Sequence, residues 1–326
     1  VQKKAEGNPF YLEELVNSLI ESGTLYRNNG GWEATKPISE SDISSTIYGV
    51  ISGRLDRLEK ETKQILQEAS VIGRAFLYKI LKKITKLENH VDKRLSVLEQ
   101  LDFLRTRSLQ PDLEYMFKHA LTQEVVYNGL LKRERRVIHE RIGLVMEQVF
   151  NERLSEFYET LAFHFTHGES LDQAVDYLMK SGEKSLARYA LEEAHQYFKD
   201  AFELLNKSPE LSGDQIRLLM DLLIKWAFIY YYRGDFIGLI DLFKAHEDMA
   251  ESLDDKARLG MFNAWYGFAL DMTGYARESF KKLLKALELG EETGNQNVIG
   301  YACTWLTWTC WDLGLLDKAI VFGERA

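Results

Sequence analysis

The sequence predicts a fold that is mainly all-α and ends in a solenoid of paired helices. Only four prolines occur in 326 residues, and none follows Pro209. Because a proline inside a helix costs ~3 kcal/mol, a proline-free stretch of this length favours stacked helices. Gly234, Gly274 and Gly314 recur 40 residues apart, each between two amphipathic segments. Such a period is typical of helical repeats, since one helical hairpin cannot bury its apolar face alone.

Composition narrows the class of protein and its compartment. The chain is long enough for two or three domains, and 45% hydrophobic and 28% charged residues are ordinary for a globular protein in solution. No apolar run reaches the ~18–20 residues that span a bilayer. Cys303 and Cys310 lie seven residues apart in one helical segment, ~10 Å along its axis and too far for a disulfide. We therefore expect a cytoplasmic protein without a membrane partner.

Charge and the chain ends indicate three domains in a piece of a longer protein. The formal net charge of −9 divides into −3 over residues 1–44, +5 over 45–150 and −11 over 151–326. A basic segment beside an acidic one suggests separate domains that attract each other. The chain begins on a polar run and stops within a helical pattern at residues 323–326. We therefore expect the end of a preceding module over 1–44 and repeats truncated at the C-terminus.

The first 44 residues predict a helix and a hairpin. Apolar residues in the segment 8–22 recur on one helical face, and Pro9 stands in the first turn, where proline is tolerated. Two short extended runs follow around the sequence Asn-Asn-Gly-Gly at 28–31. Because asparagine and glycine tolerate positive φ, residues 24–34 predict a β-hairpin.

The middle of the chain predicts a winged-helix-like domain over 45–150. Helical periodicity runs through four segments, which are 46–58, 60–72, 75–86 and 90–102. Residues 104–109 and 113–119 then form a second hairpin, turned at 110–112. A long helix is expected from about 121 to 152. Helices followed by a small hairpin and a further helix give the outline of a winged helix.

The repeats over 151–326 carry a regular register. An apolar residue stands eight positions before each turn glycine and is followed by a smaller one, which lets two helices approach closely. The smaller residues are Ala227, Gly267 and Thr307. This pattern resembles the tetratricopeptide repeat in three glycine-containing pairs and in the segment 191–201. The pairs are Ala227 with Gly234, Gly267 with Gly274, and Gly314 with Ala319.

The first half resembles the C-terminal regulatory region of STAND-class signalling ATPases. Four segments carry the likeness: GNPFYLEEL at 7–15, RLDRL at 54–58, ASVIGRAF at 69–76 and FKHALTQEVVY at 117–127. In that family the first segment closes the ATPase module. Such regions commonly follow a nucleotide-binding module in bacterial proteins that also carry an adenylate cyclase or protein kinase domain. The resemblance implies a non-enzymatic region for signal transduction and protein binding, placed between an ATPase and its ligand sensor.

The resemblance also bears on nucleotide chemistry. It implies that Gly7 and Pro9 lie close to the nucleotide in the full-length protein, which would use ATP and Mg²⁺. The sequence contains no G-x-x-x-x-G-K-[ST] phosphate loop. We therefore expect no cofactor in this chain, and neither binding nor hydrolysis of ATP by it.

Other catalytic and metal chemistry is not indicated. His164 and His167 are three residues apart on a helix and could share a metal ion, but no third ligand stands at a suitable spacing. No nucleophile elbow or catalytic-cysteine signature occurs. We therefore predict no catalytic residue and no metal site.

A basic cluster leaves a second function open. The candidate basic face consists of Lys132, Arg133, Arg135 and Arg136, with Arg141 nearby. A winged helix with such a face could make the chain a DNA-binding transcription regulator with effector-sensing repeats. Acidic residues interleave with this cluster, and the expected recognition helix at 90–102 also carries carboxylates. We therefore favour a solvated or interdomain face over nucleic-acid binding.

Aromatic residues of the repeats form the candidate partner groove. Five of the six tryptophans lie in this half of the chain. The glycine register places a set of residues on the concave side of a solenoid: Phe228, Tyr231, Tyr232, Phe268, Asp271, Tyr301, Trp308, Trp311 and Asp312. One interpretation is that these rings pack between helices. The other is a groove for a protein, a peptide or a small ligand, with part of each ring exposed at Tyr231, Phe268, Trp308 and Trp311.

Overall fold

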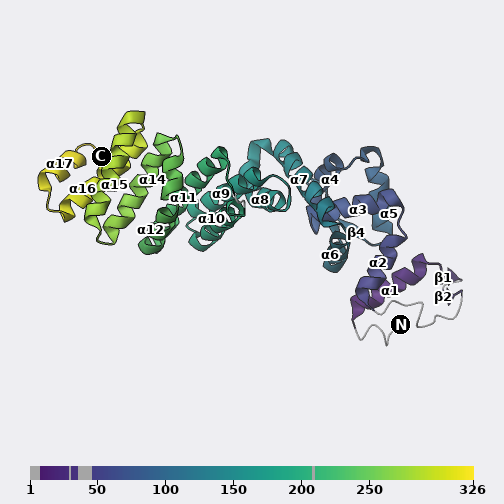
Figure 1. Ribbon diagram of the computed structural model, residues 1–326. Helices are drawn as coiled ribbons and strands as arrows, with labels where there is room; N and C mark the ends of the chain where they lie inside the picture. The colour runs from purple at the N-terminus through teal and green to yellow at the C-terminus, as the bar shows by residue number, and fades with distance from the viewer. Residues whose placement is uncertain (1–7, 29–30, 36–45, 208–209) are drawn as a thin grey trace. The chain divides into compact units, whose positions relative to one another are not determined.

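The computed structural model describes residues 8–28, 31–35, 46–207 and 210–326 (Figure 1). The chain divides into two compact units. The first comprises residues 1–156 and 167–169, and the second comprises 157–166 and 170–326. The prediction of a mainly helical fold with a few small strands is confirmed.

The first unit begins with the predicted helix and hairpin. Helix α1 (Pro9–Glu21) starts at Asn8, whose side-chain oxygen accepts hydrogen bonds from the Phe10 and Tyr11 amides. Strands β1 (Leu25–Asn28) and β2 (Gly31–Ala34) pair antiparallel. The middle of their turn, residues 29–30, lies outside the described residues.

A helical group with a three-stranded sheet follows. The sheet order is β3-β5-β4. The predicted hairpin of β4 and β5 is therefore present, and β3 pairs with the other edge of β5. The elements are α2 (Ile47–Asp56), α3 (Lys60–Ile72), β3 (Ala75–Leu77), α4 (Tyr78–Ile84), the 3-10 helix η2 (Glu88–His90), α5 (Val91–Gln100), β4 (Leu104–Ser108), β5 (Glu114–Phe117), α6 (Ala120–Asn128), α7 (Lys132–Val149) and the 3-10 segment η3 (Asn151–Glu156).

Two predicted helices of this group are wrong in part. The segment 75–86 was expected to be helical throughout, but Ala75–Leu77 pairs with β5 and buries Phe76. The single helix over 121–152 is broken after Gly129, a poor helix former. Helix α7 then starts anew, because the Glu134 carboxylate accepts a hydrogen bond from the Leu131 amide at 3.0 Å.

A buried guanidinium joins α1 to the rest of this unit. The Arg54 side chain is 1% exposed. It donates to a Glu14 carboxylate oxygen at 2.5 Å, to Glu21 at 2.8 Å from its Nε, and to the Leu101 carbonyl at 2.6 Å. Its carbon Cζ lies 4.4 Å from the centre of the Phe103 ring. One residue of α2 therefore satisfies two carboxylates of α1 and a carbonyl at the end of α5.

The second unit is a series of helix pairs. Residues 158–166 of α8 begin it. The helices are α8 (Tyr158–His167), α9 (Leu171–Ala187), α10 (Leu191–Leu205), α11 (Gly213–Arg233), α12 (Phe236–Ala245), α13 (Glu247–Ser252), α14 (Lys256–Met272), α15 (Ala276–Thr293), α16 (Gln296–Asp312) and α17 (Leu316–Gly323). Gly234, Gly274 and Gly314 stand in the turns within three successive pairs, with φ of 68°, 87° and 71°. The predicted glycine register is therefore confirmed, since each turn requires a left-handed backbone.

The close approach expected at Gly267 is also present. A Cβ built on Gly267 of α14 would lie 2.7 Å from Leu283 Cγ and 3.3 Å from the Leu283 backbone nitrogen of α15. Contacts this short force the two helices apart. The small residue at this position is what allows α14 and α15 to pack directly.

We expect Gly267→Leu to lower the free energy of unfolding by ~1–3 kcal/mol, because overpacking displaces both backbones. Gly300→Leu is the matched control. Gly300 also lies inside a helix, but a Cβ there meets nothing within 4 Å, so this variant should gain helix propensity without the clash at Cβ that Gly267→Leu creates. Urea unfolding followed by tryptophan fluorescence would compare the two variants. Equal midpoints for both would contradict the direct packing of α14 against α15 at this position.

Candidate functional site

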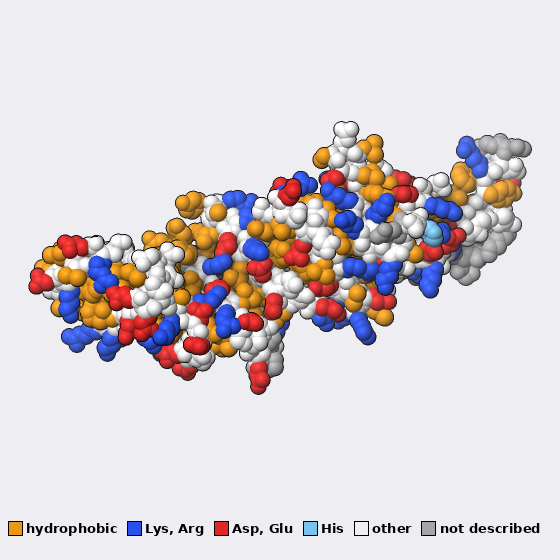
Figure 2. All heavy atoms as spheres, turned by 90° about the horizontal axis from the view of Figure 1, so that it is seen from above, with side chains coloured by type: hydrophobic (Ala, Val, Ile, Leu, Met, Phe, Trp, Pro, Cys, Tyr) orange, Lys and Arg blue, Asp and Glu red, His pale blue; other side chains and the backbone are white. Residues whose placement is uncertain are grey.

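Aromatic side chains follow the first helices of successive pairs in the second unit. Helix α14 packs against both α11 and α16. Four rings on these outer helices are exposed: Tyr231 is 45%, Tyr232 48%, Trp308 50% and Trp311 71% exposed. Figure 2 shows hydrophobic side chains at the surface of the repeats, interspersed with acidic and basic ones. Large exposed apolar side chains that gather in one place mark interaction sites.

The rings are in contact from one pair to the next. Tyr189 lies 6.3 Å from Tyr232, which lies 5.3 Å from Tyr231. Tyr231 lies 5.8 Å from Phe268, and Phe268 lies 6.3 Å from Trp308. All four are distances between ring centroids. We call these five residues the aromatic row.

The row corrects part of the predicted groove. Phe268 is 1% exposed, so the expectation that part of every ring faces solvent is wrong there. The reason is the central position of α14: Phe268 stacks on Trp305 at 4.7 Å and also contacts Tyr231 and Trp308. Phe268 is therefore the buried support of the row, and its neighbours are the exposed part.

Other predicted groove residues divide in the same way. Phe228 and Tyr301 are half-buried, against Trp265 at 4.7 Å and Trp305 at 5.0 Å respectively. Asp312 is exposed, beside Trp311. Core packing therefore explains Phe228 and Tyr301 in part. Exposure distinguishes Tyr231 and Tyr232 of α11 and the last two tryptophans of α16.

The glycine register did not reveal Tyr189. This residue is 75% exposed and follows the end of helix α9, with φ of 58°. Its turn carries a tyrosine where the later pairs carry glycine, so a register built on turn glycines does not include it. Positive φ is unusual for a bulky residue, and nothing in the local sequence indicates it.

A buried carboxyl group lies next to the row. Asp271 of α14 is 9% exposed, and its Oδ1 has no hydrogen-bond partner among the described residues. Burial raises the pKa of this carboxyl above its ordinary value, the nearby charge of Asp312 raises it further, and a hydrogen bond with Thr309 acts in the opposite direction. Thr309 also contacts the Ser279 hydroxyl at 3.1 Å. Asp271 was expected in the groove, and it lies beneath the surface with unused capacity to accept a hydrogen bond.

The candidate basic face of α7 contacts several neighbours. The Arg135 guanidinium lies 4.7 Å above the Tyr127 ring, and Arg136 donates to the Gly168 carbonyl at 3.2 Å. Arg141 donates to the Ile84 carbonyl at 2.7 Å. Lys132 and Arg133 are exposed. These cations are therefore divided between internal contacts and solvent.

The other residues considered as sites are Gly7 and Pro9, near the start of the chain, and His164 and His167 of α8. Pro9 is exposed at the first position of α1, and Gly7 lies outside the described residues. His164 is buried in α8, and the ring of His167 lies 5.2 Å from that of His139. Within the described ranges, no group of three or more histidine, cysteine or acidic side chains could hold a metal ion. No helix in the same ranges is long and apolar enough to cross a membrane.

Sequence comparison finds a bacterial relative of this chain. No family model matches the chain. An uncharacterized protein of Rhizobium meliloti (strain 1021), R02095, is 26% identical over 225 residues, which are 65% of this chain and 20% of the relative. The chain thus spans about a fifth of the length of the curated relative that it matches.

Three solved structures illustrate the structural likeness. A STAND protein with a tetratricopeptide repeat sensor from Pyrococcus horikoshii is 12% identical, with a TM-score of 0.38 over 99% of this chain and 55% of that chain. Aspartyl phosphate phosphatase F from Bacillus subtilis is 16% identical, with a TM-score of 0.44 over 86% and 67%. YrrB, a TPR protein with an unusual peptide-binding site, is 16% identical, with a TM-score of 0.37 over 63% and 92%.

Proposed function

We propose that this chain is the regulatory and protein-interaction region of a cytoplasmic signal-transduction ATPase, and that its repeats bind a protein partner through the aromatic row. The observation that carries the proposal is the row itself: Tyr189, Tyr231, Tyr232 and Trp308 are part-exposed and supported from below by Phe268. Exposed aromatic residues on a rigid support are typical anchors of protein interfaces, where a few such residues provide most of the binding energy.

The charge of the repeats indicates the chemistry of the partner. Residues 151–326 carry a formal charge of −11. Asp312 is exposed at the end of α16, and Asp271 is buried nearby with one oxygen unpaired. A complementary segment would bring arginine or lysine to these carboxylates and apolar side chains to the rings, where cations also stack favourably.

The first unit supports a coupling role. The order α3, α4, α5 and the hairpin β4–β5 fits a winged helix over 45–150, and α1 fits the end of an ATPase module over 1–44. The boundary at 44/45 itself lies outside the described residues. Arg54 connects α1 with α2 and with the end of α5 by hydrogen bonds. Packed side chains and hydrogen-bond networks of this kind can carry coupling between a sensor and a nucleotide-binding module. The output domain, an adenylate cyclase or a protein kinase, would lie elsewhere in the full-length protein.

Selection of binding peptides followed by substitution of Trp308 tests the interaction. A display library of random peptides, panned on this chain, should yield sequences that combine arginine or lysine with apolar residues. Trp308→Ala should weaken their binding by more than ~1 kcal/mol, because a truncated hot-spot ring loses most of its contact area, while the melting temperature stays close to that of the parent.

Trp32→Ala is the matched control for that experiment. Trp32 is 58% exposed on β2, in the first unit, so its removal should leave peptide affinity unchanged. The proposal is wrong if the selected peptides bind the Trp308→Ala and Asp312→Asn variants as tightly as the parent, or if the only peptides selected are acidic.

A further inference from the structure

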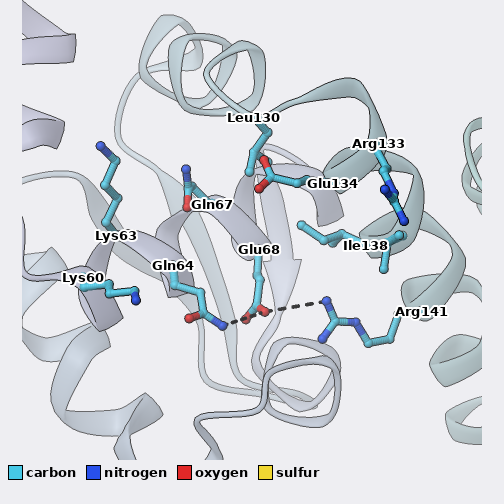
Figure 3. A pocket seen from close by; sticks show the side chains of 11 residues that line it. Lys60, Lys63, Gln64, Gln67, Glu68, Leu130, Arg133, Glu134, Ile138 and Arg141 are labelled. Atoms are coloured by element: carbon cyan, nitrogen blue, oxygen red, sulfur yellow. Dashed lines mark hydrogen bonds and ion pairs between the residues drawn. The ribbon is translucent and has the colours of Figure 1, made fainter.

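A separate cavity lies in the first unit, between α3 and α7. Its volume is about 480 Å³, within the ~300–1,000 Å³ range of small-molecule sites. Figure 3 shows residues of both helices around it. None of the residues of the aromatic row lines it. The side chains that line this cavity are both polar and apolar, and the apolar ones include Val137 and Ile138.

Two polar groups that line this cavity are incompletely satisfied. Glu68 is 3% exposed. Its Oε1 accepts a hydrogen bond from Gln64 at 3.3 Å and lies 3.8 Å from an Arg141 nitrogen, too far for a hydrogen bond. The Thr85 side chain lies close to this carboxyl group, but Oε2 makes no hydrogen bond of good geometry among the described residues. The Nε of Arg141 has none either. A buried carboxylate oxygen and a buried N–H donor are thus left unpaired on facing helices (Figure 3), an arrangement that is costly unless a ligand or water completes it.

The unpaired atoms of Glu68 and Arg141 require hydrogen-bond partners of opposite kinds. Glu68 Oε2 needs a hydrogen-bond donor, and Arg141 Nε needs an acceptor. A hydroxyl group is both a donor and an acceptor, so neighbouring hydroxyls on one ligand satisfy the pair. The amide of Gln67, which also lines the cavity, can act in either role. Burial raises the pKa of the Glu68 carboxyl, while the neighbouring Thr85 and Gln64 side chains act against that shift.

The charges at this cavity favour an anion. Lys60, Lys63, Arg133 and Arg141 line it together with only two carboxylates, Glu68 and Glu134. The formal balance is therefore positive by two when both carboxylates are ionised. Lys63 is paired with Asp56 at 2.7 Å. Lys60 and Arg133 have no ion pair within the described part of the chain, and they line the cavity from α3 and α7. A phosphate monoester, with its two negative charges, matches this balance better than a carboxylate does.

We propose that the cavity between α3 and α7 binds a small phosphate ester with a hydroxyl-bearing body, a sugar phosphate. Arg133 and Lys60 hold the phosphate at the opening, Glu68, Gln67 and Arg141 hydrogen-bond the hydroxyls, and Ile138 and Val137 contact the carbon skeleton. The repeats and the first unit then have distinct ligands, a protein segment and a metabolite.

Titration calorimetry of the whole chain tests this assignment. The probes are ribose 5-phosphate and glucose 6-phosphate, with ribose, glucose and inorganic phosphate as comparisons. At least one sugar phosphate should bind saturably and about tenfold more tightly than either inorganic phosphate or its own sugar, since both ends of the ligand contribute. Failure of both sugar phosphates to bind at millimolar concentration overturns the proposal, and so does equal affinity for inorganic phosphate.

Substitutions separate the cavity from general attraction of anions. Arg133→Gln removes an exposed cation at the opening and should lower the affinity about tenfold. Arg105→Gln is the matched control, because Arg105 is also exposed, lies on β4 and does not line the cavity. Glu68→Gln should weaken the sugar phosphate without changing the response to inorganic phosphate. If Glu68→Gln does not fold, the comparison of Arg133→Gln with Arg105→Gln decides, and equal affinity for these two variants rejects the site.

Discussion

Replacing Arg54 with alanine should lower the free energy of unfolding of the first unit by ~3–5 kcal/mol, which is the usual cost of leaving a buried charge without its partner. Glu14, whose side chain is 2% exposed, would lose the guanidinium 2.5 Å away, and the Leu101 carbonyl would lose its donor. Helix α1 would then be held by its apolar contacts with Ile47 and Val50 of α2 and by the pair of Glu13 with Lys118 at 2.6 Å. Circular dichroism in increasing urea would measure the change.

Arg57→Ala provides the control from the same helical segment. Arg57 is 43% exposed, lies 3.9 Å from Glu21 and donates to the Ser18 carbonyl and hydroxyl at 3.1 Å, so it also contacts α1, but at the surface. Exposed ion pairs contribute only ~0–1 kcal/mol. Hydrogen exchange should also show faster exchange of the α1 amides in Arg54→Ala than in Arg57→Ala, because α1 loses its buried anchor. If the two variants unfold at the same urea concentration, the buried network does not hold α1.

The sequence indicated Arg54 only through its likeness to a family motif. Its burial depends on α1 and the end of α5, which are more than 30 residues away in either direction. Local periodicity contains no information on such contacts, because they form only when distant segments pack. The same reason explains β3: the run Ala75–Leu77 is short enough for either a helix or a strand, and pairing with β5 decides it.

The repeats were easier to predict than their surface. Turn glycines and small residues such as Gly267 are local signals with a defined backbone reason, and the structure confirms both. The solvent exposure of a side chain depends on tertiary contacts rather than on the neighbouring residues in the sequence. Phe268 and Trp308 each stand six residues before the turn glycine of their pair. Phe268 is 1% exposed because it lies between Tyr231 and Trp308, whereas Trp308 is 50% exposed.

The burial of Glu68 in the cavity between α3 and α7 could not be predicted from the sequence. A glutamate in an amphipathic helix is ordinarily assigned to the solvent-facing side. Here α7 covers that side of α3, and Glu68 becomes 3% exposed. The sequence predicted one helix from about 121 to 152. In the structure this helix is broken after Gly129, and α7 packs against α3 as a separate helix, a contact that the sequence did not indicate.

Phe268→Ala should destabilise the repeats by ~3–5 kcal/mol, as truncation of a buried phenylalanine does. The ring contacts Trp305 at 4.7 Å, Tyr231 at 5.8 Å and Trp308 at 6.3 Å, so its removal leaves a cavity between α11, α14 and α16. Because each pair in a repeat array is stabilised by its neighbours, the loss should extend to the last pair. Urea unfolding monitored by tryptophan fluorescence reports on this region, which holds five of the six tryptophans.

Trp311→Ala is the counterpart of Phe268→Ala for an exposed ring. Trp311 is 71% exposed, so its removal takes little apolar surface out of the core and should change the unfolding free energy by less than ~1 kcal/mol. The two variants thus distinguish the buried support of the aromatic row from an exposed ring on the neighbouring helix. A Trp311→Ala variant as unstable as Phe268→Ala would mean that the Trp311 side chain is packed in solution, and the exposed end of α16 that also carries Trp308 would then not be available to a partner.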